Sequence, residues 1–139
     1  MKGKILVVDD DVNAQIIAET LLETRGWQVQ SVSDGAEALD LLRRNPADVV
    51  VMELQLPGMN GWELIRHLRG RFQPMPLALQ PRIVVVSAES DSATQAFALR
   101  LGANAFLKKP VVPTQFVHQV EALLSGNPRA AASAVSLTA

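Results

Sequence analysis

The sequence predicts an α/β fold, in which a doubly wound parallel sheet carries helices on both faces. Short apolar runs rich in β-branched residues alternate along the chain with segments of helical periodicity. Two of these runs, residues 49–52 and 83–86, are apolar at every position, which is typical of parallel strands buried on both faces. Five strand–helix alternations joined by right-handed crossovers leave only a few doubly wound arrangements.

The individual elements follow from the same patterns, taken in chain order. The strand-like runs predict strands over residues 5–8, 27–32, 49–52, 83–86 and 105–107. The periodic segments between and after them predict helices over residues 12–25, 34–44, 62–69, 91–101 and 113–124.

Residues at the element boundaries support these assignments. Asp34 and Glu37 form a capping-box pattern at a helix start, and Gly26 and Gly102 stand where two helices should end. Residues 70–82 contain three prolines and are longer than most connections in compact domains. They are interpreted as either a partner-contact loop or an insertion without regular structure.

Length and composition bound the possible functions. We expect one domain over residues 1–125 of the 139, followed by a tail or the start of a linker over residues 126–139. The absence of cysteine excludes disulfides, thiolate nucleophiles and cysteine-based metal sites. Thirteen basic and 14 acidic residues give a net charge of -1, and no apolar run is long enough to span a bilayer. We therefore expect a cytoplasmic protein that binds no membrane and, through this domain, no nucleic acid.

Functional side chains gather at the predicted strand ends. Three aspartates at 9–11 follow the first strand, Glu53 follows the third, Ser87 follows the fourth and Lys109 follows the fifth. Of the three aspartates, Asp11 is expected to cap the next helix. The carboxyl ends of parallel strands are where doubly wound folds place their ligands. Clustered carboxylates need a cation such as Mg²⁺, while a lysine and a hydroxyl suit a phosphoryl oxygen. The residues alone indicate Mg²⁺-dependent handling of a phosphoryl group.

The order of these motifs carries a resemblance to a known family. Over about residues 3–125, the chain resembles the CheY-like response-regulator receiver domains of two-component signalling. The matching residues are ILVVDDD at 5–11, DGAEAL at 34–39, LPGMNG at 56–61, Ser87-Ala88, Gly102-Ala103 and Lys109-Pro110. The resemblance implies a flavodoxin-like sheet with the strand order 2-1-3-4-5, and a signalling module of the phosphorelay type that is not an enzyme.

The resemblance also implies roles for the matching residues. Asp9, Asp10, Glu53 and the backbone carbonyl of Gln55 would bind Mg²⁺, with Asp9 acting partly through water. Lys109 would contact a phosphoryl oxygen, and its peptide bond to the proline that follows would be cis.

Two further positions match the switch of the family. Ser87 would be the hydroxyl that shifts toward the phosphoryl group, and Phe106 the aromatic switch, although Phe106 could equally be a core residue. The implied partners are a sensor histidine kinase or a downstream output protein or domain. A homodimer could form through the face made by the fourth helix, the fifth strand and the fifth helix.

Glu53 departs from the family pattern, which has at this place the aspartate that accepts the phosphoryl group. Glutamate keeps the charge but moves the carboxylate by about 1.5 Å, and a misplacement of about 1 Å can cost on the order of a hundredfold in rate. The longer side chain also brings an anion toward Ser87 and Lys109, where a phosphoryl oxygen would sit. We therefore interpret the chain as a pseudo-receiver that is not phosphorylated on aspartate and whose Glu53 partly mimics the phosphorylated state.

Two alternatives stay open from the sequence. The domain could be a conventional Mg²⁺-dependent receiver, phosphorylated by a histidine kinase on another carboxylate such as Asp9 or Asp10. It could instead be a small-molecule binder on a flavodoxin-like fold, for example a flavin-binding protein. Acids stand after the first strand where such a binder would carry a Gly/Ser/Thr-rich phosphate loop.

Overall fold

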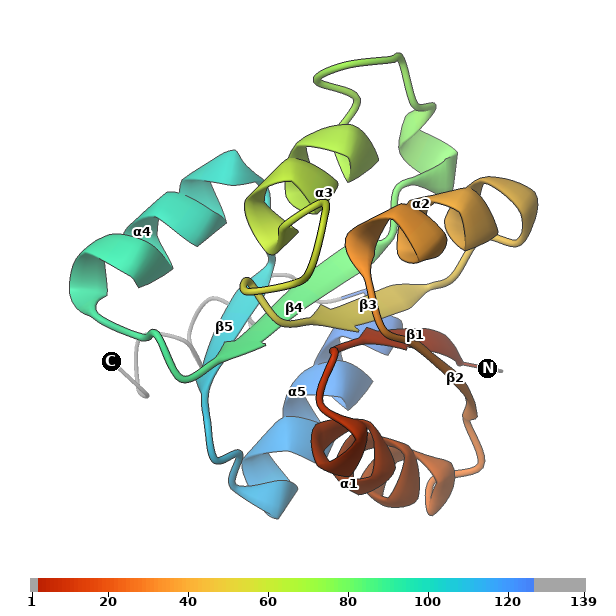
Figure 1. Ribbon diagram of the computed structural model, residues 1–139. Helices are drawn as coiled ribbons and strands as arrows, with labels where there is room; N and C mark the ends of the chain where they lie inside the picture. The colour runs from red at the N-terminus through yellow and green to blue at the C-terminus, as the bar shows by residue number, and fades with distance from the viewer. Residues whose placement is uncertain (1–2, 127–139) are drawn as a thin grey trace.

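The computed structural model describes residues 3–126, which form a five-stranded parallel sheet covered by helices on both faces (Figure 1). The elements in chain order are β1 (Lys4–Val8), α1 (Val12–Glu23), β2 (Gln28–Val32), α2 (Gly35–Arg44), β3 (Val49–Met52), α3 (Gly61–Leu68), the 3₁₀ turn η1 (Leu77–Leu79), β4 (Arg82–Ser87), α4 (Ser92–Leu101), β5 (Ala105–Lys108) and α5 (Pro113–Leu124).

The strand order is β2-β1-β3-β4-β5, with every neighbouring pair parallel. This confirms the predicted doubly wound fold and its order 2-1-3-4-5. Helices α1 and α5 cover one face of the sheet, and α2, α3 and α4 cover the other (Figure 1). The order reverses between β1 and β3, so the carboxyl ends of these two central strands flank the place where such folds hold ligands.

The hydrophobic core follows the apolar runs of the sequence. All four residues of β3 are buried, as are the apolar residues of β4 and β5, because helices lie on both sides of these strands. The edge strand β2 alternates between exposed and part-buried positions, and only Val32 at its end is buried. The buried strands β1, β3, β4 and β5 therefore hold the side chains that follow them in defined positions.

The element boundaries differ from the prediction where polar residues join a strand. Strand β4 includes Arg82 and Ser87 as well as the predicted 83–86, because Arg82 pairs with Val49 of β3 and Ser87 pairs with Lys108 of β5. Side-chain hydrophobicity carries no signal for such pairing. The 70–82 stretch is likewise not wholly irregular, since it contains η1 and the first residue of β4.

Aspartates cap three of the helix starts, as predicted for Asp11 and Asp34, whereas Asp91 was predicted to be the first residue of its helix. Asp11, Asp34 and Asp91 each precede a helix, and each side chain accepts a hydrogen bond from a backbone N–H of the first turn. Gly102 ends α4 with φ +128°, a conformation that a residue with a side chain rarely adopts. The Lys109–Pro110 peptide bond is cis, as the family resemblance implied.

Two further expectations concern the ends of the chain and membranes. The predicted tail at 126–139 lies outside the described residues, apart from Gly126. No helix within residues 3–126 is long and apolar enough to cross a membrane.

Candidate functional site

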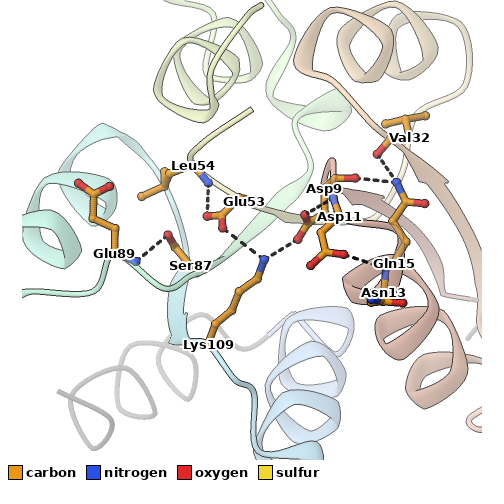
Figure 2. A network of polar contacts seen from close by, with 10 residues as sticks. All are labelled: Asp9, Asp11, Asn13, Gln15, Val32, Glu53, Leu54, Ser87, Glu89 and Lys109. Atoms are coloured by element: carbon orange, nitrogen blue, oxygen red, sulfur yellow. Dashed lines mark hydrogen bonds and ion pairs between the residues drawn. The ribbon is translucent and has the colours of Figure 1, made fainter. Parts of the chain in front are cut away.

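The predicted strand ends converge at one edge of the sheet. Asp9 follows β1 and Glu53 follows β3, and the two strands pair through Val8 and Met52 immediately before them. Lys109 follows β5, two strands away from β3, and its long side chain spans the distance between them (Figure 2). Three residues far apart in sequence thus meet because parallel strands end together.

The Lys109 ammonium lies between two carboxylates. Its Nζ donates to Asp9 Oδ2 at 2.8 Å and to Glu53 Oε1 at 3.2 Å (Figure 2). The side chains of Asp9 and Glu53 are only 8% and 11% exposed, and that of Lys109 is 24% exposed. Solvent and salt screen such a buried ion pair far less than one on the surface. Removal of any one of the three charges would therefore leave the others without compensation.

Backbone donors satisfy the remaining oxygens of these carboxylates. The N–H of Asp11 donates to Asp9 Oδ1 at 3.0 Å, and the N–H of Leu54 donates to Glu53 Oε2 at 2.7 Å. Each of the four carboxylate oxygens therefore has a protein donor. One oxygen of Glu53 accepts from the backbone of the next residue, Leu54, and the other contacts Lys109 (Figure 2). These two contacts fix the direction of the glutamate side chain.

The pKa of Lys109 is raised above its ordinary value of 10.5. Burial on its own would lower the pKa, because it penalises the charged ammonium. The hydrogen bond and the charge of Asp9, followed by those of Glu53, outweigh that effect. Lys109 is therefore firmly cationic at neutral pH and acts as the counter-ion of both carboxylates.

The two predicted switch residues are both buried. Ser87 is 1% exposed, and its Oγ accepts a hydrogen bond from the backbone N–H of Glu89 at 3.2 Å. The Ser87 carbonyl accepts a hydrogen bond from the backbone N–H of Lys109 at 3.0 Å, but among the contacts of the described residues the Ser87 hydroxyl bonds to neither the Glu53 nor the Lys109 side chain. Phe106 is 1% exposed and lies in the core, so its ring is turned inward in this structure.

Asp10 and Gln55 complete the predicted metal set, Gln55 through its backbone carbonyl. Asp10 and Gln55 are exposed, and the Gln55 side chain donates to the Glu89 carboxylate. The oxygen donors have the chemistry that Mg²⁺ prefers. Within residues 3–126, however, no three histidine, aspartate or glutamate side chains are arranged to hold one metal ion. Mg²⁺ binding by this set stays a prediction.

Gln15, which the sequence alone did not identify, contacts the backbone of the loop that carries Asp9. The side-chain amide of Gln15, on α1, donates to the backbone carbonyl of Asp9 at 2.6 Å and to that of Val32 at 3.3 Å. It thereby holds the loop after β1 against the end of β2 (Figure 2). A glutamine in the first turns of a helix has no distinctive pattern, so only the three-dimensional contact identifies its role.

Comparison with known proteins agrees with this geometry. Residues 5–121 match the family model described as the response regulator receiver domain. The chain is 37% identical over 120 residues to the transcriptional regulatory protein GltR of Pseudomonas aeruginosa, covering 86% of this chain and 48% of that protein. It is 34% identical over 127 residues to the DNA-binding response regulator MtrA of Mycolicibacterium paratuberculosis, covering 91% and 53%.

A solved structure shows the same fold. The receiver domain of the Francisella response regulator 1452 superposes with a TM-score of 0.81 at 26% identity, covering 90% of this chain and 98% of that one. The chain spans about half the length of the curated relatives it matches. The stretch that matches the family model, residues 5–121, includes Asp9, Glu53 and Lys109. This chain therefore belongs to the response regulator receiver domain family, whose members are signalling modules.

Proposed function

We propose that this domain is an atypical receiver of phosphorelay signalling, which is not phosphorylated on aspartate and in which Glu53 partly mimics the phosphorylated state. It would act in the cytoplasm through protein–protein contacts. The observation that carries the proposal is the contact of Glu53 with Lys109 at the end of β3. That contact puts a fixed anion on the lysine that would otherwise meet a phosphoryl oxygen.

The mimicry is partial for two reasons. A carboxylate carries one charge and two oxygens, whereas a phosphoryl group carries about -1.5 to -2 and three oxygens. Ser87 also keeps its hydrogen bond to Glu89 instead of bonding to Glu53. The output would accordingly be constitutive at an intermediate level, or controlled by something other than phosphate.

The contacts of the two carboxylates support a weakened affinity for Mg²⁺. Asp9 and Glu53 share the Lys109 ammonium, and backbone N–H groups occupy their other oxygens. A divalent ion would have to displace these donors before it could coordinate the carboxylates. We therefore propose that Mg²⁺ binds more weakly to this domain than to its Glu53→Asp variant.

Partners are proposed from the family and from the exposed surface. A sensor histidine kinase or a downstream output protein or domain is the partner class that this family implies. The face made by α4, β5 and α5 is the proposed site of a homodimer or an output contact. Phe97 of α4 is 41% exposed, but its ring packs against Trp62 of α3, so it does not mark this face.

The test is phosphoryl transfer from acetyl phosphate in the presence of Mg²⁺, followed by intact-protein mass spectrometry. We expect labelling of the Glu53→Asp variant, and no labelling of the wild type or of Glu53→Gln. Labelling of the wild type as fast as that of Glu53→Asp would overturn the proposal.

A second candidate is a conventional receiver phosphorylated on another carboxylate. The observation that favours it is the exposure of Asp10, which leaves this side chain accessible to a phosphodonor. Peptide mapping of acetyl phosphate-treated wild type separates the two candidates, since a phosphoryl group on Asp10 or Asp9 would support this second one.

A further inference from the structure

A cavity of about 400 Å³ extends from the site into the space between the sheet and the helices α1 and α5. Its apolar walls come from the ends of β1, β3 and β4 and from both helices, and they include Val7, Val51, Met52, Ile17, Ala18 and Phe116. Figure 1 shows α1 and α5 on the same face of the sheet, where this space lies. The volume falls in the range of about 300–1,000 Å³ that small-molecule pockets occupy.

Small side chains leave this space open. Ala14 and Ala18 of α1 and Ala88 after β4 line it with single methyl groups. Protein interiors otherwise pack densely and contain few voids larger than one water molecule. Ile17 lines the same cavity and is 53% exposed, so apolar surface reaches the cavity mouth and faces solvent. An apolar ligand body would cover that surface.

The polar end of the cavity is negatively charged. Asp9, Asp11 and Glu53 line it together with Lys109, so three carboxylates face one ammonium. Lys109 is already shared between Asp9 and Glu53, whereas Asp11 is exposed and accepts a hydrogen bond only through Oδ1 among the contacts of the described residues. A cationic group is therefore favoured at this end, and an anionic one is repelled.

We propose that this cavity binds a small organic cation with an apolar body, namely an alkylamine or arylalkylamine. The ammonium would lie beside Asp11, whose carboxylate is not paired with Lys109 among the contacts of the described residues, and the apolar body would pack against Ile17 and the alanines of α1. The proposal rests on the shape and charge of the cavity and is independent of the phosphate-mimic role of Glu53.

Three probes with the same apolar body and different end groups test the proposal: 4-phenylbutylamine, 4-phenylbutanol and 4-phenylbutyrate. Each is titrated into the ¹⁵N-labelled chain and followed by two-dimensional NMR. We expect saturable shifts of the amides of Ala14, Ile17 and Ala18 with the amine. The alcohol should bind at least about tenfold more weakly, which corresponds to the loss of one favourable charge interaction, and the carboxylate should bind more weakly still.

Two variants and one control make the test specific. Ala14→Leu fills the cavity and should reduce binding of the amine at least about tenfold, whereas Ala96→Leu, on the exposed side of α4, should leave it unchanged. Asp11→Asn keeps a helix-capping residue but removes a charge, so it should reduce the preference for the amine over the alcohol. This second variant keeps the test decisive if Ala14→Leu does not fold.

Several results would overturn the proposal. These are no binding of the amine, equal binding of all three probes, or undiminished binding by a folded Ala14→Leu chain. Shifts of the same amides on concentrating the chain without any probe would show that a second copy covers this surface, which would also overturn it. None of these results bears on whether acetyl phosphate labels Glu53→Asp, so failure here is distinct from failure of the proposed function.

Discussion

At the scale of single residues, the site depends on where one additional methylene places a carboxylate. Glu53 contacts the ammonium of Lys109 and the backbone N–H of Leu54 at the same time. Asp9 meets the same ammonium from β1. The three side chains form one shielded unit, in which the lysine is the counter-ion that clustered carboxylates require.

Removal of the lysine charge should therefore be costly. In Lys109→Met, two largely buried carboxylates lose their shared cation, and we expect the free energy of unfolding to fall by about 3 kcal/mol. Chemical denaturation of the wild type and the variant measures this difference. Lys108→Met is the matched control, because Lys108 is exposed, and its effect should stay within about 0.5 kcal/mol. Equal effects of the two substitutions would contradict the structure of the ion pair.

The difference in the free energy of unfolding between the wild type and Lys109→Met should depend on pH in a way that follows from the pKa of Lys109. Its pKa in the folded state is raised above the ordinary 10.5, so the stabilisation is fully present below the unfolded-state pKa and is lost as pH rises through the folded-state pKa. The stability gap between wild type and Lys109→Met should therefore be constant from about pH 7 to about pH 9 and should narrow above about pH 10.5. A gap that narrows between pH 7 and pH 9 would be inconsistent with this pKa.

The sequence predicts the contacts between strand ends but not those that support them. Asp9, Glu53 and Lys109 could be brought together because each directly follows a recognisable strand. The amide of Gln15 could not be assigned, since its partners are backbone carbonyls that have no signature in the sequence. Backbone-directed contacts of this kind need coordinates.

At the scale of elements, the loops between helices and strands carry connections that periodicity cannot reveal. Arg69, at the end of α3, donates to the carbonyls of Gly102 and Pro81 at 2.9 and 2.7 Å and to Asn104 Oδ1 at 3.0 Å. Burial, and then the charge of Arg82, lower its pKa to about 10, which leaves it protonated at neutral pH. This arginine ties α3 to the start of β4 and to the α4–β5 connection.

Substitution of Arg69 should loosen those connections together. Arg69→Met removes the side-chain donors of two part-buried carbonyls, those of Gly102 and Pro81, while Asn104 Oδ1 keeps its bond from the N–H of Ile83. We expect a loss of about 3 kcal/mol in the free energy of unfolding. Urea denaturation checks this value, with Arg100→Met on the exposed face of α4 as a control expected to change it by less than about 0.5 kcal/mol. A loss of the same small size for both variants would show that Arg69 does not bear this structural role.

The β3–α3 loop approaches α3 closely at Gly61. A Cβ added at this residue would lie 2.6 Å from the Glu53 carbonyl oxygen and 2.6 Å from the Leu54 Cα. Gly61→Ala should therefore destabilise the fold by about 2 kcal/mol and disturb the backbone that holds Glu53. Thermal unfolding together with the NMR shifts of Glu53 and Leu54 measures both effects. Unchanged stability and unchanged shifts would contradict the close approach.

At the scale of the whole molecule, the alternation of strands and helices is sufficient to predict the doubly wound sheet, because the runs that are apolar at every position, 49–52 and 83–86, must be buried on both faces. The order of strands came from the family resemblance and is confirmed by the pairing. The ends of β4 were not predictable, since Arg82 and Ser87 join it through backbone pairing with β3 and β5. The cavity beneath α1 and α5 was also beyond the sequence, because it depends on which small side chains face the sheet.

We propose that Glu53 holds the site part of the way toward the state that an ordinary receiver reaches when phosphorylated. The face made by α4, β5 and α5 would report that state, since Phe106 belongs to β5 and Ser87, at the end of β4, pairs with Lys108 of β5. Beryllofluoride with Mg²⁺ is a suitable probe because it imitates a phosphoryl group bound to aspartate.

The most direct measurement compares two-dimensional NMR spectra of the wild type and Glu53→Asp, each with and without Mg²⁺ and beryllofluoride. We expect the amides of Ser87, Phe106 and α4 to shift in Glu53→Asp when the reagent is added and not to shift in the wild type. We also expect the shifts of the untreated wild type to lie closer to those of treated than to those of untreated Glu53→Asp. A wild type that responds as strongly as Glu53→Asp, or that coincides with the untreated variant, would contradict the claim.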